Sequence, residues 1–118
     1  MIKFPKPKFK KKRRHHAESI MQPKNDGQCW ICSRVYGCYR KYTYLEKHHV
    51  FFGNGRREIS EANGFTVWLC PAHHTAGPDA VHRNQRMNRL VQRATQDRFE
   101  VNHTREEFMA LIGRNYIE

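Results

Sequence analysis

Two short runs of residues in the middle of the chain predict β-strands. The first, residues 45–52, reads Leu-Glu-Lys-His-His-Val-Phe-Phe and ends at Gly53-Asn54-Gly55. The second, residues 65–69, follows Asn63-Gly64 and reads Phe-Thr-Val-Trp-Leu. Residues 56–63 between the runs are polar, with room for a helical turn. We expect the runs to pair as a hairpin with a long connection.

Beyond Pro71 the spacing of apolar residues changes to that of a helix. Met87, Leu90, Val91 and Ala94 follow one another at i, i+3, i+4 and i+7, which places them on a single face. The remaining positions are polar and rich in arginine, which would face water or phosphate: Arg86, Arg89, Arg93 and Arg98.

A last helix is predicted near the C-terminus. Thr104 with Glu107 three residues later forms a capping-box pattern, and Gly113 is a natural helix end. The predicted order is therefore β, β, α, α, preceded by a turn at Cys29–Cys32. This order indicates one small α+β domain, and at 118 residues a structural metal would compensate for a limited core.

Charge is concentrated at the N-terminus. The chain carries a formal net charge of +11, and eight Lys and Arg with no acid fall within residues 1–16. We expect residues 1–25 to be a disordered polybasic arm and linker, and residues 26–118 to be the folded domain. A charge run this dense favours nucleic acid as partner over a merely solubilising role, and the residues expected to bind it are Lys10, Lys11, Lys12, Arg13 and Arg14.

Neither a membrane span nor a signal peptide is expected. No apolar run is long enough to cross a bilayer, and the basic stretch leads into His15-His16-Ala17-Glu18 rather than a hydrophobic segment. The sequence therefore predicts a soluble, cytoplasmic protein, in which paired cysteines indicate a metal rather than disulfides.

The cysteines and one histidine form a zinc-ligand pattern. Cys29-x-x-Cys32 and Cys70-x-x-His73 each place two ligands on one tight turn, as a tetrahedral structural zinc site requires. Cys38 could compete for the fourth position, but His73 occupies the matching place in the second turn and is preferred.

Four histidines remain once His73 is assigned to zinc. His48, His49, His74 and His82 lie within a short stretch of a basic protein, where neutral imidazoles can hold a divalent cation and another imidazole can act as a general base. These histidines favour a metal-dependent catalytic site over scattered surface or core residues.

The same residues resemble a known motif order. His48-His49-Val50, Asn63, Leu69-Cys70-Pro71-Ala72-His73-His74 and the stretch from Gly77 to Asn84 resemble the HNH, or ββα-metal, endonucleases. The resemblance is to small phage-type members with a cysteine knuckle, similar to phage recombination-enhancement nucleases, and it extends over roughly residues 29–118.

The resemblance implies a role for each residue. His49 would be the general base, His48 and His74 would bind a catalytic Mg²⁺ or Mn²⁺, and His82 would complete that shell or bind the scissile phosphate. Asn63 would orient His49, although Asn54 or Asn84 could hold that role instead. Adjacent strand residues point to opposite faces, so His48 and His49 share a site only if the strand is irregular there.

The implied activity is one-metal hydrolysis of phosphodiester bonds. Arg56 and Arg57, after the glycine turn, are candidates for stabilising charge on the phosphate. The implied partners are DNA, whether duplex, single-stranded or branched, and a recombinase with which the protein could cooperate in phage DNA recombination, repair or packaging. The main alternative is a zinc-stapled nucleic-acid-binding module that cuts nothing, for which Tyr39, Tyr42 and Tyr44 would stack on bases.

Overall fold

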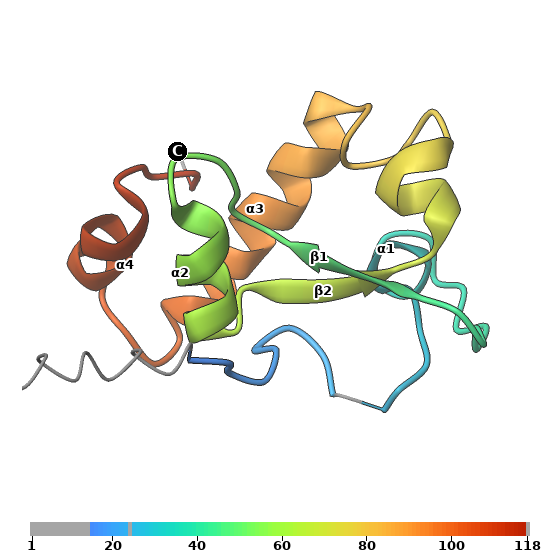
Figure 1. Cartoon of the computed structure of the whole chain (residues 1–118), viewed down its shortest axis with the longest axis horizontal. Coiled ribbons are helices and arrows are strands. Elements are labelled where there is room, and N and C mark those ends of the chain that lie inside the picture. The colour runs from blue at the N-terminus through green and yellow to red at the C-terminus, as the bar shows by residue number, and fades with distance from the viewer. Residues whose placement is uncertain (1–14, 24, 118) are drawn as a thin grey trace, which may run out of the picture.

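The computed structural model describes residues 15–23 and 25–117 of the chain (Figure 1). Residues 1–14, with the basic side chains expected to bind nucleic acid, lie outside the described residues. The elements are, in order, α1 (Trp30–Arg34), β1 (Glu46–His49), α2 (Arg56–Asn63), β2 (Thr66–Leu69), the π-helix η1 (Ala72–Ala76), α3 (Gln85–Phe99) and α4 (Arg105–Ile112). The described part is a mixed α/β fold around a two-stranded sheet.

The predicted pairing of the two runs, residues 45–52 and 65–69, is confirmed. β1 and β2 are antiparallel, with His48 opposite Val67 and His49 opposite Thr66. The strands are shorter than the runs, because the chain bends at Val50 and Phe51. The connection holds the full helix α2 rather than a single turn, bracketed by Gly55 and Gly64, both with φ in the left-handed region.

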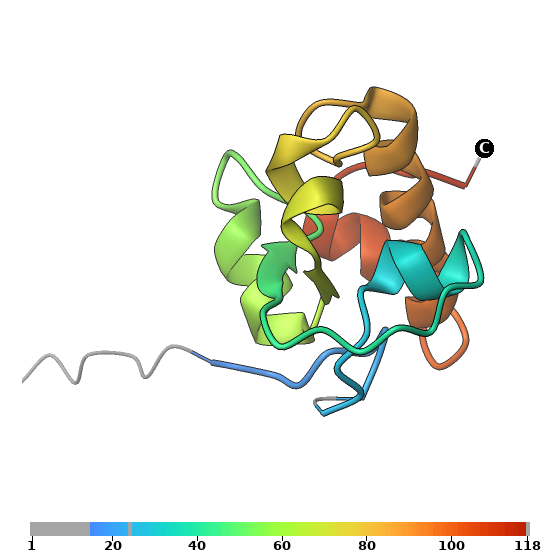
Figure 2. The ribbon, with the colours of Figure 1, turned by 90° about the vertical axis from the view of Figure 1, so that its right-hand side faces the viewer.

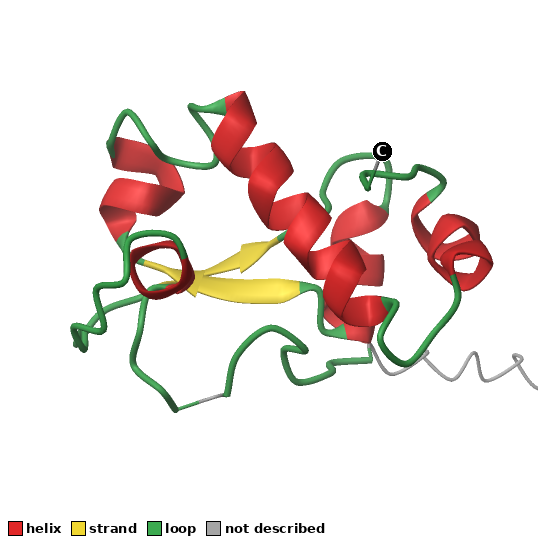
Figure 3. Cartoon of the chain, turned by 180° about the vertical axis from the view of Figure 1, so that it is seen from behind, coloured by secondary structure: helices red, strands yellow, loops and turns green. Residues whose placement is uncertain are grey.

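The sheet has one buried face and one mixed face. Side chains alternate along each strand, so His48 shares its face with its neighbour Val67, and Lys47 and His49 lie on the other. Val50, Phe65, Val67 and Leu69 on the first face are all fully buried. Figure 2 shows α2 and α3 on opposite sides of the strands, and α3 crosses the sheet when seen from behind (Figure 3).

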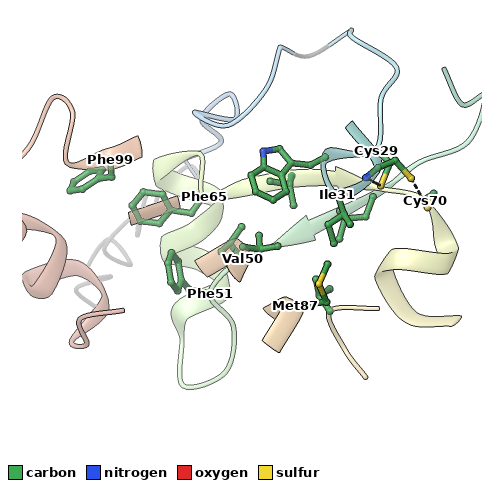
Figure 4. Close-up of a cluster of buried hydrophobic side chains, with 14 of the residues drawn as sticks. Cys29, Ile31, Val50, Phe51, Phe65, Cys70, Met87 and Phe99 are labelled. Carbon is green, nitrogen blue, oxygen red and sulfur yellow. Dashed lines mark hydrogen bonds between the residues drawn. The ribbon is translucent and has the colours of Figure 1, made fainter. Parts of the chain in front are cut away.

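The core is a continuous apolar layer along the molecule. It runs from Phe99 and Phe65 at one end to Cys29 and Cys70 at the other (Figure 4). Phe108 from α4 meets Phe51 and Phe65, with ring centroids 5.4 and 6.0 Å away. Burial of each phenylalanine contributes about 1.5–3 kcal/mol to the stability of this end of the molecule.

α4 begins and ends where the sequence predicts. The Thr104 side chain accepts a hydrogen bond from the Glu107 backbone N–H, the Glu107 carboxylate accepts one from Thr104, and Gly113 ends the helix in the left-handed conformation.

The buried stripe of α3 differs from the predicted one. Met87 and Val91 are buried as expected, but Leu90 is 39% exposed and the stripe continues through Thr95 to Phe99. Thr95 tolerates burial because its hydroxyl donates to the Val91 carbonyl. The prediction from side-chain polarity alone therefore put Leu90 on the buried face of α3 and left out Thr95 and Phe99.

Part of the predicted disordered linker is ordered against the domain. The Ile20 amide donates to the Gly64 carbonyl, the Ser19 hydroxyl to that of Thr66, and the Gln22 side chain accepts from the Trp68 amide. This segment thereby satisfies the outer hydrogen-bonding groups of β2, which composition could not indicate. None of the helices within residues 15–23 and 25–117 is both long and apolar enough to cross a membrane.

Candidate metal centres

Two separate groups of side chains in the described residues could each hold a metal ion. Cys29, Cys32, Cys70 and His73 form the first, and His48, His74 and His82 form the second. Within each group one ligand atom per residue lies within 4.8 Å of the others. Both groups are sets that the sequence predicted.

The Cys/His group joins the N-terminal side of α1 to the turn after β2. His73 Nδ1 lies 3.7 Å from Cys29 Sγ, 3.3 Å from Cys32 Sγ and 3.4 Å from Cys70 Sγ, and the Cys32 and Cys70 sulfurs are 3.9 Å apart. A zinc ion with bonds of about 2.3 Å to sulfur and about 2.05 Å to nitrogen has tetrahedral edges of about 3.8 and 3.6 Å. The four side chains therefore fit a tetrahedral ion such as zinc.

The surroundings of this group act on the ionisation of its sulfur atoms in opposing directions. The Tyr42 hydroxyl lies 3.3 Å from Cys32 Sγ, and the Tyr36 ring stacks on His73 with centroids 5.6 Å apart. Burial raises the pKa of the Cys29 thiol to about 12 and also raises that of Cys32. A bound divalent cation opposes that effect because it stabilises thiolates directly. Cys38 is exposed and belongs to neither group.

The second group brings together three histidines from three parts of the chain. His48 comes from β1, His74 from η1, and His82 from the loop before α3. Their ring centroids are 5.3 Å apart for His48 and His74, 5.0 Å for His48 and His82, and 4.8 Å for His74 and His82. The π-helix thus carries adjacent histidines that belong to different groups.

The loop that carries His82 is held back over η1. The amides of Val81 and His82 donate to the carbonyls of His73 and His74, at 2.8 and 3.2 Å. Gly77 permits this return, because a Cβ at that position would lie 2.6 Å from the Ala72 carbonyl oxygen. α3 then starts afresh at Gln85, with Asn84 as its N-cap. The loop between His74 and His82 is therefore what allows His82 to join the group.

His48 carries the feature that best matches a metal ligand. Its side chain is 1% exposed, and its Nε2 is buried with no hydrogen-bond partner among the described residues. Burial, reinforced by the charges of His82, His74 and His49, lowers the pKa of His48 to about 3. His82 has a pKa lowered by burial as well. His48 and His82 therefore offer neutral imidazole lone pairs at neutral pH.

A carboxylate fixes the orientation of His74. Glu46 Oε1 lies 2.9 Å from His74 Nδ1, which leaves Nε2 for another partner. The hydrogen bond with His74, with a second from Tyr44, lowers the pKa of Glu46, so its carboxylate is ionised. Such outer carboxylates orient histidine ligands in metal sites. Glu46 was missed from the sequence, although its place two residues before His48 puts it on the same strand face.

His49 lies on the other face of β1, since the register is regular through this residue. Its Nε2 is 2.8 Å from Glu61 Oε1, and the same carboxylate accepts from Lys47 Nζ at 2.7 Å. Burial of Glu61 disfavours its ionised form, but hydrogen bonds from Lys47, His49 and His16 outweigh that effect and lower its pKa to about 2.

Glu61, and not one of the three asparagines, is the side chain in contact with His49. Asn63 instead donates to the Ile59 carbonyl at 2.9 Å, Asn84 caps α3, and Asn54 sits in the exposed turn with φ of 51°. Among the described residues none of these three bonds to His49. No local signal could have pointed to Glu61, because only the formation of α2 returns it to β1.

The two arginines that were predicted to bind phosphate lie in different environments. Arg56 is partly buried and donates from Nε to the Ile112 carbonyl at 3.2 Å, whereas Arg57 is exposed.

Comparisons of the chain with known protein families, with curated proteins and with solved structures found no match. The chemistry of the site therefore rests on the side chains themselves.

Proposed function

We propose that this protein is a metal-dependent endonuclease of the HNH type. The observation that carries the proposal is the buried, unpartnered Nε2 of His48 beside His74 and His82. Leaving a buried polar nitrogen without a partner costs about 1–3 kcal/mol, so a ligand that accepts its lone pair is favoured. A divalent cation bound by the three histidines would supply positive charge to the phosphate and to the departing oxygen.

The order of elements supports the same proposal. Two antiparallel strands are followed by η1 and α3, which matches the ββα arrangement that the resemblance implies. The Cys/His group fastens α1 to this unit through Cys70 and His73, which lie in the same turn as His74. Zinc would hold the scaffold, and Mg²⁺ or Mn²⁺ would serve the reaction, with Ni²⁺, Co²⁺ or Zn²⁺ as substitutes for an imidazole shell.

His49 is the proposed general base. His48 is 1% exposed and lies on the face of β1 opposite His49, so the phosphodiester would contact an ion held by His48 rather than the His48 ring. In this proposal it crosses the C-terminal end of β1 to reach His49 on the other face. In the reaction His49 takes a proton from the attacking water, and Glu61 holds the imidazole and stabilises its protonated form. The products would carry a 5′ phosphate.

DNA is the proposed substrate, in a phage process such as recombination, repair or packaging that could include a recombinase. The basic arm of residues 1–14 would add affinity without reading sequence. Exposed Tyr39 and Tyr44, at 69% and 61%, favour the alternative of a binding module, because exposed tyrosines can stack on unpaired bases.

Cleavage of supercoiled plasmid tests the proposal. With added Mg²⁺ or Mn²⁺, wild-type protein is expected to nick or linearise the plasmid, and zinc-loaded His49→Ala to lose about 10²–10⁴-fold in rate. Metal analysis must first show that both proteins retain one zinc. If the zinc-loaded wild type binds plasmid, single strands and branched DNA but cuts none of them, the endonuclease is excluded and the binding module replaces it.

Glu61→Gln is expected to lower cleavage about 10- to 100-fold while the fold is retained. The substituted amide would still contact His49, but it carries no negative charge to oppose the positive charge that His49 gains when it takes the proton from water. Glu58→Gln is the matched control, since Glu58 is an exposed carboxylate on the same helix. A rate equal to that of the control would reduce Glu61 to a structural role.

A further inference from the structure

A groove rich in arginine lies along the exposed side of α3. It has a volume of 710 Å³, and its lining includes Arg86, Arg89, Arg93 and Arg114. Asp79 is the acid in this lining, and its carboxylate already accepts a hydrogen bond from the Tyr36 hydroxyl at 3.0 Å. The groove is therefore strongly positive.

The arginines of this groove are not neutralised within the described part of the chain. No ion pair there involves any of the four, whereas Arg34 and Arg105 elsewhere pair with Asp26 and Glu100. Arginines repel one another unless an anion lies between them. Four unpaired guanidinium groups around one hollow thus favour a ligand with several negative charges.

Two of the guanidinium groups are held in place by an aromatic ring. Arg89 lies 5.6 Å and Arg114 5.2 Å from the centroid of the Tyr116 ring. Tyr116 is itself anchored, because its backbone amide donates to Gln96 Oε1 at 2.7 Å and its ring packs against Phe51 at 5.3 Å. Two cations fixed by one ring lose less freedom on binding an anion than free side chains do.

The groove continues toward the three histidines. A second hollow of 180 Å³ shares Arg89, Arg114 and Tyr116 with it and extends to Arg56 and Phe52. Phe52 is 41% exposed, and its ring lies 5.2 Å from His82 and 5.9 Å from His48. One surface therefore leads from the histidine group past Phe52 to the arginines of α3.

Leu90 gives this surface its apolar component. It is 39% exposed and lines the groove together with Arg86 and Arg93. Several cations with an apolar side chain among them match a chain of phosphates joined by sugars, and match free inorganic phosphate poorly.

We infer that this arginine groove binds the sugar–phosphate backbone of the nucleic acid on the side of α3, and directs it past Phe52 to His48, His74 and His82. The part of this inference that concerns cleavage at the histidines rests on the proposed function. Binding of nucleic acid to the groove does not depend on it. The inference assigns a substrate-binding surface to the folded domain, separate from the arm of residues 1–14 and from Arg57.

The test compares two double substitutions of equal charge in the full-length, zinc-loaded protein. Arg93→Gln with Arg114→Gln removes two exposed cations from the groove. Arg40→Gln with Arg98→Gln removes two exposed cations that lie outside its lining and that form no ion pair within the described residues. Binding of a short fluorescent DNA duplex is measured by anisotropy over a range of salt, without added divalent ion, so that nothing is cut.

The groove variant is expected to bind roughly tenfold more weakly or worse at about 0.1 M salt, with a salt slope lower by about 1.8, as for two lost phosphate contacts. The control should stay near wild type. Equal affinity and slope in the two variants would overturn the inference and assign binding to other cations, including the arm.

Hydrolysis of bis(4-nitrophenyl) phosphate with added Mn²⁺ separates the two proposals. This small diester needs no extended binding surface, so its hydrolysis by the wild-type protein reports on the histidine group rather than on the groove. If wild type fails to hydrolyse it and also leaves plasmid intact, the proposed function fails, while the anisotropy result still decides the groove.

Discussion

Cys70→Ser is expected to abolish zinc binding and to unfold the half of the domain that contains α1. The sulfur of Cys70 lies 3.9 Å from Cys32 Sγ and 3.4 Å from His73 Nδ1, and a serine hydroxyl is a far weaker zinc ligand than a thiolate. Structural zinc contributes about 10–16 kcal/mol in small zinc-dependent peptides, as much as the whole stability of a typical domain. α1 spans only Trp30–Arg34, which is too short to be stable as an isolated helix, so we expect it to depend on that ion.

Zinc content by metal analysis and thermal unfolding by circular dichroism measure this effect. Cys38→Ser is the matched control, since Cys38 is exposed and lies outside the group. It should keep one zinc and the wild-type melting temperature. A Cys70→Ser protein that retains stoichiometric zinc and a cooperative transition near that of wild type would refute the assignment of Cys70.

His48→Gln is expected to remove the second metal site and to lower cleavage about a thousandfold. Loss of charge stabilisation by the ion is worth several kcal/mol in the transition state, which corresponds to that factor. Glutamine keeps a polar group of similar length in the buried position, so the fold should survive. With a pKa of about 3, His48 is neutral in this buried position, and its loss leaves no unpaired charge behind.

Titration with Co²⁺ followed by absorbance separates the two centres. Thiolate ligands give charge-transfer bands and imidazoles do not, so wild type should bind one thiolate-bound ion and one further ion. His48→Gln should retain only the first. If the variant binds two ions and cuts plasmid at the wild-type rate, the three histidines are not a metal centre.

The parts of this fold that could be predicted are those set by local signals. β2 follows from the apolar run after Gly64, the end of the first strand run from Gly53-Asn54-Gly55, α4 from its capping box, and the Cys/His group from two ligand spacings. The turn and capping signals involve residues within a few positions of one another. The Cys/His group joins two distant pairs, but each pair has the spacing of metal ligands and needs the other to complete a tetrahedral site.

The features that the sequence did not indicate depend on long-range packing. Glu61 meets His49 only because α2 forms between the strands, and the polar composition of that segment, typical of a loop, concealed the helix. Leu90 was placed on the buried stripe because apolar residues are usually buried, whereas Thr95 and Gln96 are buried because Thr95 bonds to Val91 and Gln96 to Glu100, Asn115 and Tyr116. Ordering of residues 15–23 likewise depends on β2 offering unpaired groups.

The adjacency of His73 and His74 has a consequence for how such a chain can change over evolutionary time. A single peptide unit joins a ligand of one group to a ligand of the other, so adding or deleting one residue between Cys70 and His74 would dismantle both centres together. The exposed turn Gly53-Asn54-Gly55 has no comparable constraint. Proteins built on this plan should therefore vary in length at that turn and keep the Cys70–His74 interval unchanged.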